Sequence, residues 1–120
     1  MNQQYKNILK NTISFEDDLF QRLQNKVFSK AYLETALGEY KKDGDTQALL
    51  LAMRDVAEAQ GGIGKLAKKT TISREHLYDI LASKHNPRLD NWLSIISALG
   101  FRVRLEPQKK TAKRLVADKK

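Results

Sequence analysis

Residues 63–82 read IGKLAKKTTISREHLYDILA, which has room for two short helices and a tight join between them. Ser73 is a favourable N-cap for the second helix, and Leu77 and Ile80 fit the inward face of that helix. Ala67 supplies the small side chain that the first helix needs where the second crosses it. Two short helices joined by a few residues, the second begun by a serine cap, are typical of a helix-turn-helix.

The outward face of the second helix is polar and charged. In a helix-turn-helix the N-terminal part of this helix enters the major groove of DNA. Arg74 is the best base-reading candidate, because a guanidinium pairs bidentately with guanine. Nearby basic side chains are candidates for phosphate contacts. The predicted DNA-binding residues are Lys65, Ser73, Arg74, Glu75, His76, Tyr78, Lys84 and Arg88.

The join between the two helices departs from the common pattern at one position. Such turns often use glycine for a residue with left-handed backbone, and Thr71 stands there. A β-branched residue is disfavoured at positive φ. The turn therefore either takes another conformation or carries strain.

Upstream of this motif, the apolar spacing predicts two further helices. Ser14 is placed to cap the first of them, and Ser29 is placed to start the second. The first helix has a stripe of apolar residues that recur every four positions, which is a helical spacing. This stripe consists of Phe15, Leu19, Leu23 and Val27.

Residues 46–60 carry the strongest helical pattern in the chain. Gly44 breaks the preceding pattern, and Asp45 is a favourable N-cap for this helix. The apolar stripe is broad, since residues 50–52 widen it, and a broad stripe indicates a helix packed on more than one side. Gly61-Gly62 ends the helix.

Downstream, Asp90 is placed to cap a last helix, in which the spacing of Trp92 favours a core position. The next five residues alternate apolar and basic side chains, the period of a half-buried strand. One strand alone leaves its backbone groups unpaired, so we expect it to pair with the same strand of a second subunit. The predicted dimer strand consists of Phe101, Arg102, Val103, Arg104 and Leu105.

The charge of the 120-residue chain is uneven. It has 22 Lys and Arg against 14 Asp and Glu, a formal net charge of +8. Residues 61–105 hold eight basic and three acidic side chains, and residues 106–120 hold six and two. A polyanion would therefore meet the second half. Residues 29–60 are net acidic and are the expected place for a basic protein partner; Tyr32 and Tyr40 there are packing residues or part of a partner-binding groove.

Other classes of function find little support in the sequence. The chain has no cysteine, which excludes disulfides and thiolate zinc sites. His76 and His85 make a poor metal pair, and no set of nucleophile, base and acid stands out. We therefore expect no enzyme, no metal and no cofactor. No apolar run approaches the ~20 residues of a membrane span, so we expect no membrane partner and a cytoplasmic location.

Residues 67–100, AKKTTISREHLYDILASKHNPRLDNWLSIISALG, resemble the Cro/lambda-repressor-like (Xre) DNA-binding domain. The longer span 14–106 is similar to the addiction-module antidote proteins, a HigA-like antitoxin group. The stretches that carry this likeness include AYLETALGEYKKDGD, ALLLAMRDVAEAQGGIGKLAKKT and RVRLE. The resemblance implies five core helices, binding to double-stranded operator DNA, and autorepression. It also implies pairing with a small RelE/ParE-like toxin.

The expected fold is therefore all-α. It is a lambda-repressor-like five-helix helix-turn-helix domain with an N-terminal helical extension and one short C-terminal β-strand. The expected divisions are an N-terminal helical extension (1–28), the helix-turn-helix domain (29–106) and a basic flexible tail (107–120). The tail is either a solubilising segment or a source of non-specific attraction to nucleic acid.

The predicted function is a sequence-specific DNA-binding repressor that acts as the antitoxin of a type II toxin–antitoxin pair, as a homodimer. Two alternatives stay open. One is a stand-alone Xre-type regulator that has no toxin. The other is a protein-interaction module of the same fold that has lost DNA reading.

Overall fold

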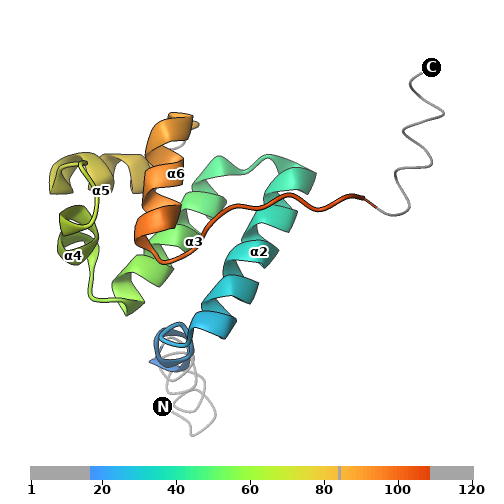
Figure 1. The fold of residues 1–120 in the computed structure, drawn as a ribbon, viewed down its shortest axis with the longest axis horizontal. Helices are drawn as coiled ribbons and strands as arrows, with labels where there is room; N and C mark the ends of the chain where they lie inside the picture. Colours follow the sequence, from blue (N-terminus) through green and yellow to red (C-terminus); the bar gives the residue numbers. More distant parts are fainter. Residues whose placement is uncertain (1–16, 84, 109–120) are drawn as a thin grey trace, which may run out of the picture.

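The computed structural model describes residues 17–83 and 85–108. This part of the chain is mainly helical and holds no strand, which confirms the all-α part of the predicted fold class. Residues 17–22 are helical and precede α2. The helices that follow are α2 (Lys26–Asp43), α3 (Thr46–Ala59), α4 (Ile63–Lys68), α5 (Arg74–Ala82) and α6 (Leu89–Ala98) (Figure 1).

The start of α2 differs from the prediction. Asn25, not Ser29, is the N-cap, and its side-chain oxygen accepts a hydrogen bond from the backbone N–H of Phe28 at 3.0 Å. Ser29 is buried inside α2 and donates to the carbonyl oxygen of Leu23 at 2.6 Å. The turn at residues 23–25 resets the helical phase, so Val27 leaves the predicted apolar stripe and is 77% exposed.

The predicted break between the second and third helices is confirmed. Gly44 ends α2 with a left-handed φ of 68°, and its N–H donates to the Tyr40 carbonyl at 2.7 Å. Asp45 then caps α3, because its side chain accepts a hydrogen bond from the N–H of Ala48 at 3.0 Å. The predicted cap Ser14 lies outside the described residues.

Helix α3 is the centre of the core. It packs against α2, α4 and α5, as its broad apolar stripe predicts. Leu50 and Val56 are fully buried, whereas Leu51 is 52% exposed, so the stripe is narrower than expected on that side. Helices α4 and α5 pack on each other as well as on α3.

The join between α4 and α5 takes another conformation without a left-handed residue at Thr71. Among the described residues, only glycines have positive φ, so Thr71 does not carry the strain that a left-handed backbone would impose. Thr70 supports the turn, because its hydroxyl oxygen accepts a hydrogen bond from the N–H of Ile72 at 3.0 Å. Ile72 is buried and anchors the turn to the core.

The start of α6 also corrects a prediction. Arg88 occupies the N-cap position, and Asp90 lies within the first turn of α6. An acid there still favours the helix, because it faces the positive end of the helix dipole. Ile95 and Leu99 are buried and Trp92 is half-buried against the core, as predicted.

After α6 the chain continues as an irregular segment, residues 101–108, which crosses in front of α3 and α2 in the view of Figure 1. Lys26 at the start of α2 ties the beginning of this segment down. Its Nζ donates to the carbonyl oxygen of Leu99 at 3.2 Å and lies 5.1 Å from the ring centroid of Phe101. The predicted strand at residues 101–105 is not formed within this single chain and stays a prediction about a pair of chains. No helix of the described residues is both long and apolar enough to cross a membrane.

Candidate nucleic-acid interface

Helix α5 presents the side chains that the sequence assigns to DNA. Ser73 fixes its start, because the serine hydroxyl oxygen accepts a hydrogen bond from the N–H of His76 at 3.1 Å. The residues Arg74, Glu75 and His76 form the first turn, and all three are exposed. The inward residues Leu77, Ile80 and Leu81 are buried, as predicted. The N-terminal end of α5 therefore presents hydrogen-bond donors and acceptors to a partner, and the opposite face of the helix packs into the core.

Helix α4 places basic groups next to α5. Lys65 and Lys68 are both exposed on this helix. The aliphatic part of Lys65 lies against Gly61, where a Cβ would sit 2.7 Å from the lysine Cδ. Gly61 has a φ of 119°, a backbone conformation that favours glycine. This contact holds Lys65 over the turn that leads into α4.

Arg54 adds a basic group that the sequence did not reveal. The Cζ of Arg54 on α3 lies 5.8 Å from the ring centroid of Tyr78, the predicted site residue on α5. A guanidinium over an aromatic face is attracted by the negative face of the ring. The interaction depends on how α3 packs on α5, so the only sequence signal was a basic residue inside the apolar pattern of residues 46–60. Arg54 brings one further positive charge to the outer side of α5.

Two further predicted site residues, Lys84 and Arg88, belong to the loop before α6. Arg88 is paired with Asp90, with Arg88 Nε 3.1 Å from Oδ1 and Nη2 3.0 Å from Oδ2. The hydrogen bond and the opposite charge raise the pKa of Arg88 and lower that of Asp90. Both groups are exposed, so the pair does not withdraw Arg88 from solvent. Lys84 lies outside the described residues.

The loop itself is tied to α3 by one hydrogen bond. The hydroxyl of buried Thr46 donates to Asn86 Oδ1 at 2.6 Å. This bond links the loop after α5 to the start of α3, 40 residues away in the chain. It therefore fixes the loop relative to the core.

The charge of the α4–α5 pair favours a polyanion. Residues 63–82 hold four basic side chains, Lys65, Lys68, Lys69 and Arg74, against two acidic ones, Glu75 and Asp79. All six are exposed, so water can be replaced by a charged partner at each of them. The arrangement can bind phosphates through the lysines and can hydrogen-bond a base edge through Arg74.

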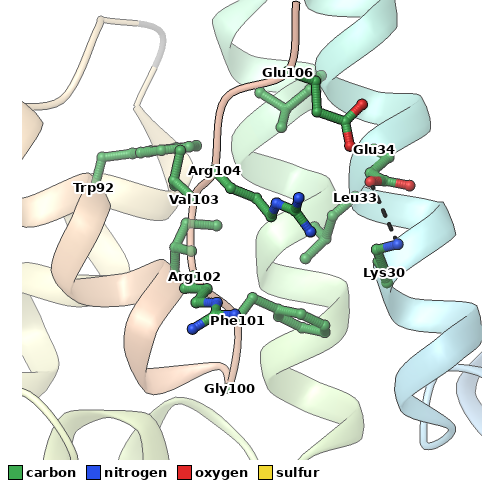
Figure 2. Close-up of a pocket in the computed structure, with 12 residues that line it drawn as sticks. Lys30, Leu33, Glu34, Trp92, Gly100, Phe101, Arg102, Val103, Arg104 and Glu106 are labelled. Carbon is green, nitrogen blue, oxygen red and sulfur yellow. Dashed lines mark ion pairs between the residues drawn. The ribbon is translucent and has the colours of Figure 1, made fainter.

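The second candidate surface is a groove of about 580 Å³, lined by α2, α6, residues 100–104 and Glu106. Figure 2 shows Val103 beside Trp92 on the α6 side, and Arg104 and Glu106 directed toward α2. On α2, Lys30 and Glu34 form a loose ion pair at 3.9 Å. The groove has apolar walls with charged side chains along its rim.

The aromatic residues of α2 are packing residues. Tyr32 and Tyr40 are half-buried and pack against the core. The phenol of Tyr32 donates to Asp55 Oδ2 on α3 at 2.7 Å. Of the two interpretations of these tyrosines, the structure favours packing between α2 and α3. The nearby groove is lined instead by Leu33 and Leu37.

Residues 13–107 match the model of a family described as "probable addiction module antidote protein". The match covers most of the chain, including α2–α6 and the groove-lining segment after α6. No curated protein and no solved structure matches the chain at a significant level.

Proposed function

The chain belongs to the addiction-module antidote family, and we propose that it is the antitoxin of a type II toxin–antitoxin pair that also binds operator DNA as a repressor. In this proposal α2–α6 form the five helices of a lambda-repressor-like domain, with α4 and α5 as its helix-turn-helix. The protein acts by binding, without catalysis and without a cofactor. Family membership supports the antitoxin role, and the α4–α5 surface supports the DNA-binding role.

One observation carries the DNA-binding role. The serine-capped α5 exposes Arg74, Glu75 and His76 in its first turn, beside the exposed lysines of α4. In helix-turn-helix proteins this end of the second helix enters the major groove. Arg74 would read a guanine, since its guanidinium matches the two acceptors of that base. Lys65 and Lys68 would contact the phosphates on either side.

The mechanism begins with electrostatic capture of the duplex by the basic second half of the chain. Each phosphate contact releases condensed counterions, so the affinity falls steeply as the salt concentration rises. Base contacts from α5 then select the operator. A homodimer formed through residues 101–105 would present two such helices about one DNA turn apart, as a two-fold operator requires.

The second partner is a toxin protein. An antidote of an addiction module implies a toxin, and we propose a small RelE/ParE-like protein encoded beside this chain. Residues 29–60 hold six acidic and four basic side chains, and this net negative charge would attract a basic toxin. Co-purification with the neighbouring gene product tests this part. A neighbouring gene that encodes no small basic protein would favour a stand-alone regulator of the same fold.

The DNA-binding part is tested with Arg74→Ala in gel shifts on the duplex upstream of the chain's own gene. We expect a loss of about 1–3 kcal/mol of binding free energy and relaxed specificity at one base pair. Lys41→Ala is the matched control, because Lys41 is an exposed cation on α2, outside the α4–α5 pair. Equal binding by Arg74→Ala and the wild type would refute the assignment. A wild type that shifts no duplex would instead favour a protein-interaction module.

A further inference from the structure

Helix α6 carries an apolar stripe that continues from the core into solvent. The stripe consists of Leu89, Trp92, Leu93 and Ile96, which are spaced i, i+3, i+4 and i+7 and so share one face of the helix. Ile96 is buried, Trp92 is half-buried, Leu93 is 41% exposed and Leu89 is 70% exposed. Trp92 and Ile96 also line the groove. The wall of the groove therefore opens onto an apolar surface at the start of α6.

The backbone of residues 102–106, the segment that follows α6, lacks hydrogen-bond partners among the described residues. Val103 is 53% exposed and Leu105 is 92% exposed. Figure 2 places Val103 directly beside Trp92. A backbone segment without hydrogen-bond partners among the described residues, which also exposes Val103 and Leu105, is the kind of edge to which another strand adds.

The charges of residues 102–106 become complementary when two copies of this segment lie antiparallel to each other. Residues 102–106 read RVRLE, with the side chains of Arg102, Arg104 and Glu106 alternating with Val103 and Leu105. We infer that a second copy of the chain covers this surface, paired antiparallel through residues 102–106 with Arg102 of each copy opposite Glu106 of the other. The inference rests on the homodimer of the proposed function and adds its register and its apolar contact surface.

Other registers are less favourable. A shift by one residue places charged side chains opposite apolar ones, because the side-chain period of a strand is two. A shift by two residues toward the N-terminus places Arg102 opposite Arg104 twice, and like charges directly opposite are destabilising. A shift by two the other way pairs Arg104 with Glu106 twice, but it leaves Arg102 opposite Gln108 and brings Pro107, which lacks a backbone N–H, opposite Val103. In the inferred register the two copies of Arg104 face each other once at the two-fold axis, between the two Arg102–Glu106 contacts.

The same pairing covers the apolar surface. In this register Val103 of each copy lies opposite Leu105 of the other, and Figure 2 shows Val103 beside Trp92 of the α6 stripe. Burial of Leu89 and Leu93 against the other copy removes apolar area from water, which favours association. The C-terminal segment leaves the molecule on the side away from α4 and α5 (Figure 1). The dimer therefore leaves the proposed DNA-binding surface of each copy free.

A charge-swap experiment on the full chain tests the register. Arg102→Glu alone creates two Glu–Glu contacts in the homodimer, and Glu106→Arg alone creates two Arg–Arg contacts. We expect each variant to raise the dimer dissociation constant roughly tenfold or more in sedimentation equilibrium. An equimolar mixture of the two variants restores both opposite-charge contacts, so we expect a heterodimer as tight as the wild-type dimer. The double variant in one chain should also dimerise as the wild type does.

Arg102 and Glu106 are exposed, so neither swap should affect folding, and circular dichroism melts verify this. Leu93→Glu is a second probe, which places a charge in the covered stripe and should also weaken the dimer. Dimerisation of Glu106→Arg at wild-type strength, or no heterodimer in the mixture, would overturn the register. A wild type that is monomeric at all concentrations, with the stripe covered only by a toxin or by residues 109–120, would overturn the interface. Gel shifts of the wild type on its own promoter separate these results from failure of the proposed function, because they report whether the wild type binds DNA whichever way its two copies pair.

Discussion

The phenol hydroxyl of Tyr32 donates a 2.7 Å hydrogen bond to the carboxylate of Asp55, across the interface between α2 and α3. Burial and the adjacent carboxylate raise the pKa of Tyr32 above its usual value near 10. The bond needs the phenol proton, so the folded state holds this proton more tightly than the unfolded chain does. The interaction therefore links α2 to the core below about pH 10 and weakens above it.

Tyr32→Phe should lower the free energy of unfolding by about 1–2 kcal/mol at neutral pH, because the carboxylate of Asp55 loses a hydrogen bond. Above about pH 10 the unfolded wild type loses the phenol proton while the folded protein keeps it, so wild-type stability falls. The variant lacks this group, and the difference between the two proteins should shrink as the pH rises. Urea unfolding from about pH 8 to about pH 11 measures the effect. Parallel pH profiles would contradict it.

The cap of α5 gives a second prediction. Ser73→Ala removes the acceptor for the N–H of His76 and should cost about 1 kcal/mol of stability, within the usual range for N-caps. Ser73→Asp keeps an acceptor at the same place and should retain most of the stability. Thermal unfolding of the two variants and the wild type checks this. Equal melting temperatures for Ser73→Ala and the wild type would show that the cap contributes nothing to stability.

Replacing each of two glycines, one inside α2 and one at its C-cap, should change the stability of the protein in opposite directions. Gly38 lies inside the helix with nothing within 4 Å of a Cβ, so Gly38→Ala should stabilise the protein by about 0.5–1 kcal/mol. Gly44 ends the helix with a φ of 68°, so Gly44→Ala should destabilise it by about 1–2 kcal/mol. Denaturant unfolding of both variants tests the pair. A loss of stability in Gly38→Ala would mean that the exposed face of α2 tolerates no added methyl group.

The elements best predicted from sequence are those fixed by local chemistry. Ser73 and Asp45 are caps in the structure because a short side chain with an oxygen can reach a backbone N–H two or three residues on. The core residues of α5 and α6 follow from helical spacing alone. The same reasoning failed where two local signals competed. Ser29 and Asn25 are both good cap residues, and the buried bond of Ser29 to Leu23 depends on a turn that the spacing does not reveal.

Features that depend on packing between helices could not be predicted from the sequence. From the sequence Arg88 is a candidate DNA contact and Asp90 a candidate cap, but the structure pairs them. Arg54 falls within the helical pattern of residues 46–60, and only the packing of α3 on α5 brings it to Tyr78. The surface of α5 was the most predictable part of the candidate site, because its outward face is what remains once the core stripe is removed.

The contact between Arg54 and Tyr78 leads to the last prediction, on DNA binding. If Arg54 meets a phosphate beside α5, Arg54→Ala should weaken binding about equally on specific and non-specific duplexes and reduce the salt slope by about 1. Tyr78→Leu keeps the bulk but removes the ring that Arg54 lies over, and should reproduce part of the effect. Lys41→Ala, which removes a cation from α2, should leave both affinity and slope unchanged. Gel shifts across a salt series measure these quantities, and an Arg54→Ala variant with the wild-type slope would place Arg54 outside the interface.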